Sequence, residues 1–193
     1  MYEKCDNIRI FCCSFSLRMV FYYKKKRGRF RKGAVMRLLF KQRMFSWFDS
    51  YDIYNERWQK VYTVKGQLSW GHCLKVYDAR GYEVGTLKER MLTWLPQFEI
   101  YAEGQHIGHI SKEFSFVFPR YRIEGKDWNA QGSILEWDYT IRDGNENLIA
   151  TVKKEFFNWT DTYVLDIVNP LDGLMVLMFV LAIDAEKCSR NNR

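Results

Sequence analysis

The sequence predicts a mainly β protein, a closed antiparallel barrel of twelve strands around a hydrophobic C-terminal helix. Three observations predict this fold. Short alternating segments fill residues 37–168, an internal repeat of strand, turn and strand runs through them, and one uninterrupted apolar run follows. Because an open sheet rarely exceeds about ten strands, and closure removes the sheet edges, this number of strands favours a barrel.

The repeat is visible in four segments: "DIYNERWQKVYTVKG", "KVYDARGYEVGTLKE", "EIYAEGQHIGHISKE" and "TIRDGNENLIATVKKE". Each reads as a strand, a polar or glycine-containing turn, a second strand and a lysine, which is the pattern of a β-hairpin. From Ile141 to Lys153 the last copy is one residue longer than the others. The spacing from tyrosine to lysine is 11 residues in three copies: Tyr54–Lys65, Tyr77–Lys88 and Tyr101–Lys112.

An aromatic corner follows each lysine of a second series, at positions 41, 65, 88, 112 and 154. The intervals are 24, 23, 24 and 42 residues, and the long one has room for an extra hairpin in 120–141. Two corners share the order Trp-x-Asp-x-Tyr, starting at residues 47 and 159, and a catalytic acid would not need two remote copies. We therefore interpret the corners as architecture and expect their rings to cap the sheet. The corner aromatics are Trp47, Trp70, Trp94, Phe116 and Trp159.

The segment "NPLDGLMVLMFVLAIDAEKC", residues 169–188, predicts a helix over about 171–187. Asp172 suits the positive end of its dipole and Lys187 the negative end. All ten residues from Leu174 to Ile183 are apolar, which indicates burial on every side. Such a run is about 15 Å long, half of a bilayer core of about 30 Å, so we predict no membrane span. We expect the helix to fill the lumen that twelve strands enclose.

Residues 1–35 form a separate basic extension. They hold 10 Lys and Arg against 2 acidic residues, a net charge of +8, whereas residues 36–193 hold 20 against 21, a net of −1. One interpretation is a basic tether for a membrane or nucleic acid, with acylated Cys12 and Cys13. The other, which we favour, is a leader that is not translated or is disordered. The string "RKGAVM" can be encoded with a bacterial ribosome-binding site before Met36. The domain then spans residues 36–188, and 189–193 form a tail.

Candidate sites for chemistry are few. The residues His72, Cys73, His106 and His109 raise the question of a metal, but His106 and His109 are three apart in a strand, where we expect them to face opposite sides. Glu136 and Asp138 share a strand face, and spacing does not place them across a cleft. The sequence contains no glycine-rich phosphate loop, nucleophile elbow or CxxC motif. We predict no catalytic, metal-binding or cofactor-binding residue and no cofactor, and the acidic balance after residue 35 argues against nucleic acid.

Residues 36–188 resemble the LURP-one-related family, its bacterial members in particular. The segments that carry the resemblance are "LLFKQRMFSWFDSYDIY", "YTVKGQLSWGHCLKVYDARGYEVGTLKE", "EWDYTIRDG" and "DTYVLDIVNPLDGLMVLMFVLAIDAEKC". The resemblance implies the tubby C-terminal-like fold, which phospholipid scramblases share. It implies no agreed catalytic residues. Tubby-like domains bind phosphoinositides and scramblases carry a calcium-binding stretch, but no acidic calcium loop occurs in this sequence.

We therefore expect a non-catalytic binding or scaffolding module that recognises a lipid headgroup, a hydrophobic molecule or a protein. A scramblase-like membrane-associated protein and an enzyme with an unrecognised site are the two alternatives. The five cysteines include three in the basic extension, and the remaining two make a poor disulfide framework. A reducing cytoplasm fits this pattern best, and the protein is expected there, including at the membrane periphery.

The start-site hypothesis predicts that the native protein begins at Met36. Mass spectrometry of protein from its natural source should find an N-terminal peptide starting at that residue. A peptide that spans Arg31 to Arg37 would contradict the hypothesis, because it requires translation of the basic extension.

Overall fold

The computed structural model describes residues 35–41, 50–67, 69, 71–115, 120–133, 138–157 and 160–191. Residues 33–193 form one compact unit, which contains twelve strands, a short 3-10 helix and one α-helix. The strands are β1 (Met36–Lys41), β2 (Ser50–Asn55), β3 (Lys60–Gln67), β4 (Cys73–Asp78), β5 (Glu83–Glu89), β6 (Gln97–Ala102), β7 (Gln105–Glu113), β8 (Arg120–Glu124), β9 (Trp128–Ser133), β10 (Asp138–Asp143), β11 (Leu148–Phe157) and β12 (Thr160–Ile167).

The strands form a closed antiparallel barrel in which each strand pairs with its neighbours in the chain. Closure comes from β1 and β12, whose ladder runs from Met36 opposite Ile167 to Lys41 opposite Thr162. On the outside of this seam the Arg37 guanidinium bonds to the Asp166 carboxylate with an Nε–Oδ1 distance of 2.6 Å. The predicted twelve-stranded barrel is confirmed, and β8 and β9 are the extra hairpin expected in the long interval of the repeat.

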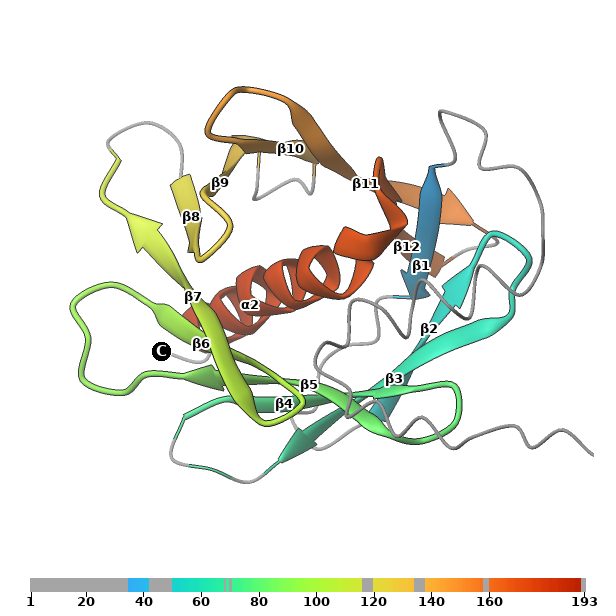
Figure 1. Ribbon diagram of the computed structural model, residues 1–193, viewed down its shortest axis with the longest axis horizontal. Helices are drawn as coiled ribbons and strands as arrows, with labels where there is room; N and C mark the ends of the chain where they lie inside the picture. Colours follow the sequence, from blue (N-terminus) through green and yellow to red (C-terminus); the bar gives the residue numbers. More distant parts are fainter. Residues whose placement is uncertain are drawn as a thin grey trace, which may run out of the picture. The chain divides into compact units, whose positions relative to one another are not determined.

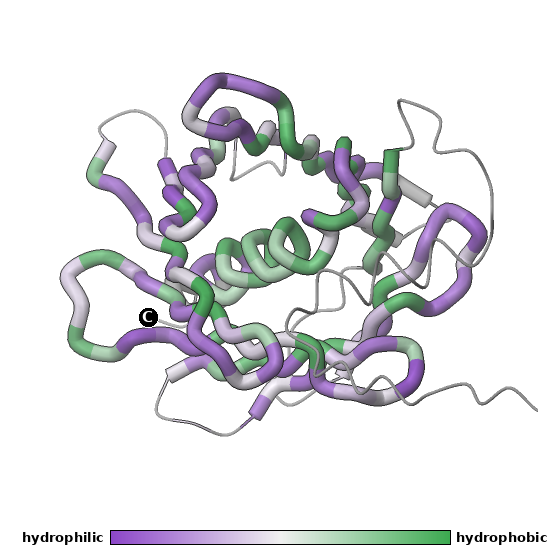
Figure 2. The backbone as a smooth tube through the Cα atoms, viewed as in Figure 1, coloured by the Kyte–Doolittle hydropathy of each residue, from purple (hydrophilic) through white to green (hydrophobic). Residues whose placement is uncertain are grey.

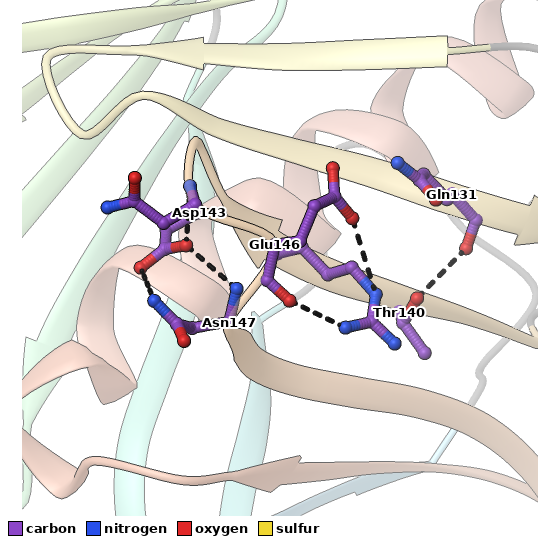
Figure 3. Close-up of polar contacts among 7 residues, drawn as sticks. Gln131, Thr140, Asp143, Glu146 and Asn147 are labelled. Carbon is purple, nitrogen blue, oxygen red and sulfur yellow. Dashed lines mark hydrogen bonds and ion pairs between the residues drawn. The ribbon is translucent and has the colours of Figure 1, made fainter.

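Three of the repeated hairpins are closed by the same loop. An Asn or Asp at its start accepts two hydrogen bonds through Oδ1, from the backbone N–H groups two and four residues later, at 2.9–3.0 Å. Figure 3 shows the loop after β10, where the side chain of Asn147 adds a third bond to Asp143, at 2.9 Å. A side chain that satisfies loop N–H groups in this way holds the turn without help from the barrel. The three residues are Asn55, Asp78 and Asp143.

Each of the four repeated hairpins carries one extra residue in its second strand, just after the loop. The extra residue is Val61, Val84, Ile107 or Ile149. The pairing also corrects the predicted length of the last copy. Arg142, not Ile141, occupies the position of Tyr54, so that copy has the same spacing of 11 residues to its lysine.

The bulge in β7 overturns the expectation that His106 and His109 face opposite sides. His106 pairs with Tyr101 and His109 pairs with Glu99, and both partners lie on the outer face because Ile100 between them is buried. An extra residue restarts the alternation of a strand, so two residues three positions apart share a face.

One helix passes through the barrel (Figure 1). After β12 the chain forms the 3-10 helix η1 (Pro170–Asp172), whose first turn is capped by the side chain of Asn169, and then α2 (Gly173–Asn191). The predicted helix over 171–187 is therefore confirmed, with an end four residues later. Figure 2 shows hydrophobic residues along α2 and hydrophilic residues in many of the turns around it.

The apolar run of α2 forms the centre of the core. From Val176 to Ile183 no residue is more than 1% exposed. The ring of Phe179 packs edge-on against Tyr121 and Tyr139, with ring centroids 6.2 and 6.4 Å apart. On the opposite wall Gly85 leaves room for Met178, since a Cβ there would lie 2.9 Å from Met178 Cε. Each large apolar side chain buried in this way contributes about 1.5–3 kcal/mol.

The order of the strands gives the barrel two different ends. The turns after the even-numbered strands lie at one end, which we call the turn end, and the connections after the odd-numbered strands lie at the other, the corner end. The helix enters at the turn end, where Leu174 and Met178 lie against Gly85 near the start of β5. It therefore reaches the corner end with its C-terminal turns. None of the helices in the described ranges is long and apolar enough to span a membrane.

The bulge in β7 can be tested at Gly108. This residue has φ +151°, and a Cβ would collide with the backbone carbonyl oxygen of Glu124 on β8. Gly108→Ala should therefore destabilise the protein by at least about 3 kcal/mol, because neither backbone can move without breaking the barrel ladder. Gly104→Asn is the matched control, since its φ of +78° suits Asn and nothing lies within 4 Å. Chemical denaturation that showed equal losses for the two variants would contradict this account.

Candidate functional site

Buried charge is concentrated where α2 reaches the corner end. The helix is apolar up to Ile183, but Asp184 and Glu186 follow it inside the barrel, with 5% and 1% of their surface exposed. Burying a carboxylate costs several kcal/mol unless charged or hydrogen-bonding groups compensate. We name Lys112, Tyr121, Asp184 and Glu186 the polar cluster.

Glu186 is compensated by two side chains of the barrel wall. Lys112 Nζ lies 2.6 Å from Glu186 Oε1, and the hydroxyl of Tyr121 donates a short hydrogen bond to Oε2. Lys112 and Tyr121 face each other across the β7–β8 ladder, so one carboxylate joins both strands to the helix. The Lys112 ammonium also lies 5.9 Å from the centre of the Tyr121 ring. Charge-assisted bonds of this kind are among the stronger polar contacts in proteins.

Lys112 faces the lumen because its hairpin has a shorter loop. Five residues separate the paired residues Tyr54 and Lys60, as in the β4–β5 and β10–β11 hairpins, but only four separate Tyr101 and His106. At constant spacing the lysine of this copy therefore lies one position further along its strand, and a shift of one residue reverses the face. The corresponding lysines of the other copies are exposed: Lys65, Lys88 and Lys153.

Asp184 has a different environment from Glu186. Burial raises the pKa of its carboxyl to about 7, and the nearby charge of Lys187 opposes this rise only in part. Within the described residues, no side chain donates a hydrogen bond to this carboxyl or forms an ion pair with it. Burial and the charge of Asp184 also raise the pKa of Tyr139 on β10 well above its ordinary value. Asp184 is thus a carboxyl that can take up and release a proton near neutral pH.

Sequence reasoning did not find the polar cluster. It treated Lys112 as one member of a lysine series, and it used Asp184 and Glu186 only to bound the apolar run. The available signal was the loop "AEGQ", which is one residue shorter than "NERWQ", "DARGY" and "DGNEN". Read together with the strand alternation, that missing residue predicts an inward lysine.

The residues considered for a metal site are spread over the barrel. His72 Nδ1 lies 2.5 Å from Glu89 Oε2, and His109 Nε2 lies 3.2 Å from Glu124 Oε1. Cys73 is buried, and this burial raises the pKa of its thiol. Asp138 is exposed at the start of β10, and Glu136 lies outside the described residues. No cluster of three or more metal-ligating side chains exists in the described parts of the chain.

An open hollow of about 410 Å³ lies beside the β8–β9 turn, lined by Arg122, Glu124, Gly125 and Asp127. Its charges are already engaged, since Arg122 lies 3.2 Å from Asp127 and Glu124 pairs with His109. A polar and open surface offers few of the apolar contacts on which small-molecule sites depend. We therefore do not place the candidate site there.

The connection between β5 and β6 exposes an apolar surface at the corner end. We call residues 90–96 the apolar loop. Leu92 and Trp94 are 102% and 103% exposed, and Met91 is half exposed. Phe114, which follows β7 at the same end, is also exposed. The prediction that the corner aromatics cap the sheet is wrong for Trp94. The other four, Trp47, Trp70, Phe116 and Trp159, lie outside the described residues.

The apolar loop has a fixed backbone and touches the polar cluster. Arg90 N–H donates to the Gln97 carbonyl at 2.9 Å and closes the loop at its base. Lys112 N–H donates to the carbonyl of Pro96 at 3.2 Å, so the residue that binds Glu186 through its side chain also holds the end of the loop. The candidate functional site therefore consists of the exposed apolar loop and the buried polar cluster behind it.

The unusual carboxyl of Asp184 makes stability depend on pH. Its pKa of about 7 lies above the unfolded value of about 3.9, so the folded protein retains a proton that the unfolded chain loses. Stability should fall as the pH rises from about 4 to about 7, by on the order of 4 kcal/mol from this group, and then stay constant. Asp184→Asn should remove this fall, so the variant should be the more stable protein at pH 8 and equal to the wild type near pH 4.

Chemical denaturation followed by circular dichroism at each pH measures both proteins. The difference between the two curves isolates Asp184 from the other titrating groups. Curves that run parallel from pH 4 to pH 8 would contradict the assignment.

The chain is similar to known proteins over most of its length. The profile of the LURP-one-related family matches residues 36–184. Uncharacterized protein YxjI of Bacillus subtilis (strain 168) is 28% identical over 151 residues, which cover 78% of this chain and 93% of that protein. The X-ray structure of a protein from Arabidopsis thaliana shares the fold, with a TM-score of 0.56 and 14% identity over 79% of this chain and 91% of the other. The resemblance noted in the sequence is thereby confirmed, and the chain belongs to the LURP-one-related family.

Proposed function

We propose that this protein is a non-catalytic binding module of the cytoplasm, which docks on a phospholipid surface with the apolar loop. The observation that carries the proposal is the full exposure of Leu92 and Trp94. Two large apolar side chains held in water are a cost that docking would remove, at about 1.5–3 kcal/mol for each side chain buried.

The composition of the loop supports a lipid surface. Tryptophan is enriched where membranes meet water, because its ring is apolar and its N–H is polar. Met91 and Leu92 have the flexible apolar side chains that can enter the acyl region beside it. Lys88 and Arg90 are exposed at the base of the loop, where phosphate groups of lipids would lie.

The conformation of the loop supports a docking role as well. Leu92 has φ +64°, a left-handed conformation that is uncommon for a branched side chain. The hydroxyl of Thr93 donates to the carbonyl of Arg90 at 3.3 Å. A loop that is held with its apolar side chains outward loses little conformational freedom on binding.

The filled lumen supports external binding over internal binding. Lipid-binding barrels that hold a ligand inside need free volume there. In this barrel the apolar run of α2 occupies the axis, and its side chains from Val176 to Ile183 are buried. A partner would therefore meet the outer surface, and the corner end is where that surface is most apolar.

Liposome flotation tests the proposal. The full chain and residues 36–193 are mixed with neutral and anionic vesicles, after circular dichroism has shown that the shorter protein is folded. Both proteins should float, and Leu92→Ala with Trp94→Ala should weaken the binding of each by at least about tenfold. Tyr82→Ala, which removes an exposed ring at the turn end, is the matched control and should have no effect.

Other outcomes would change the proposal. If only the full chain floats, the binding belongs to the basic extension in residues 1–35. If neither protein floats, the apolar loop serves a protein partner or a small molecule instead.

A further inference from the structure

We propose that residues 184–191, the last turns of α2, form a proton-sensitive latch: they are seated in the barrel when Asp184 is neutral and leave it when Asp184 is ionised. The latch is argued from contacts inside the barrel. Its effect on docking rests on the proposed function, but its existence does not.

The charges inside the corner end balance only when Asp184 is neutral. Lys112 is the one cation that the described structure places against these two carboxyls from the barrel wall, and its ammonium is held at 2.6 Å by Glu186. An ionised Asp184 adds a second buried negative charge with no counter-ion in the lumen. A buried unpaired carboxylate is strongly unfavourable, so ionisation favours any conformation that brings Asp184 to water.

The groups around Asp184 do not supply a second positive charge. Tyr139 on β10 is the barrel group that interacts electrostatically with it, and Tyr121 on β8 and Lys112 on β7 are engaged with Glu186. Lys187 on the helix itself attracts the ionised form, and it is only partly buried. An ionised Asp184 is thus stabilised by movement toward Lys187 and solvent, which is the direction of release.

The helix can release its end without leaving the barrel. Residues 174–183 are held by apolar contacts along the axis, including the rings of Tyr121 and Tyr139 against Phe179. The contacts of Glu186 hold the following turns. Local opening of a helix end needs far less free energy than global unfolding when few apolar contacts are lost.

Release of the latch would change the end that carries the apolar loop. It separates Glu186 from Lys112, and the Lys112 backbone N–H is already bonded to the carbonyl of Pro96. The ammonium of Lys112 then becomes an unpaired cation beside the apolar loop. A cation next to exposed Leu92 and Trp94 favours an anionic lipid surface over a neutral one.

Amide hydrogen exchange of the full chain tests the latch without any lipid. Wild type and Asp184→Asn are compared at each pH from 5 to 8, which cancels the intrinsic pH dependence of exchange. In the wild type, residues 184–191 should exchange faster than residues 174–183. Their rate relative to Asp184→Asn should rise on the order of tenfold per pH unit, because opening releases one proton, and should level off above about pH 7. A pH-independent ratio, or equal exchange of the two segments, would overturn the latch.

A second variant tests the closing contact. Lys112→Met removes the cation that holds Glu186, so residues 184–191 should exchange rapidly even at pH 5, whereas Lys65→Met, an exposed lysine of the same repeat, should behave as the wild type. Slow exchange in Lys112→Met at pH 5 would overturn the role of Lys112. If that variant does not fold, Glu186→Gln makes the same test with the side-chain shape preserved.

Flotation at pH 8 then separates the latch from the docking function. Asp184→Asn should bind anionic vesicles more weakly than the wild type, because its latch stays closed. Equal binding, together with the expected exchange pattern, would keep the latch and remove its link to docking. Absence of binding by either protein would overturn the proposed function and leave the exchange result intact.

Discussion

The filling of the barrel by the protein's own helix is the interaction on which the rest of the structure depends. Twelve strands enclose more space than their inward side chains occupy. The apolar run of α2 occupies that space, and rings such as Phe179 complete the core from the axis rather than from the wall. The same filling directs recognition to the outer surface, and it forces any polar residue of the helix into an environment without water. The properties of Asp184 and Glu186 follow from this constraint.

The repeated hairpin shows how a small local change produces a special position in a regular fold. Four copies share a loop, a bulge and a lysine, and three of them place the lysine in solvent. One loop is a residue shorter, and its lysine, Lys112, faces inward and binds the helix. No change in residue type is involved. The polar cluster therefore arises from register, which is an all-or-none property in a strand because side chains alternate.

This difference also explains what could be predicted from the sequence. Period-two segments and hairpin turns are local signals, so the twelve strands and the extra hairpin were predictable, and the ten apolar residues from Leu174 to Ile183 predicted the buried helix. The facing of Lys112, His106 and His109 depends on bulges and loop lengths, which change the periodicity without changing the composition. The exposure of Trp94 was mispredicted because an aromatic residue near a strand end is apolar in either location, and only the path of the chain decides whether its ring packs.

The position of α2 in the chain has a consequence for the order of assembly. Neighbouring strands pair along the whole chain, so each hairpin can form early from local contacts. The seam between β1 and β12 is the long-range exception, and the helix that fills the lumen follows β12. During synthesis the ribosome therefore releases twelve strands before the centre of their core exists. The nascent chain must remain an open, incompletely packed sheet until its final segment emerges, and this interval is when a chaperone would be most needed.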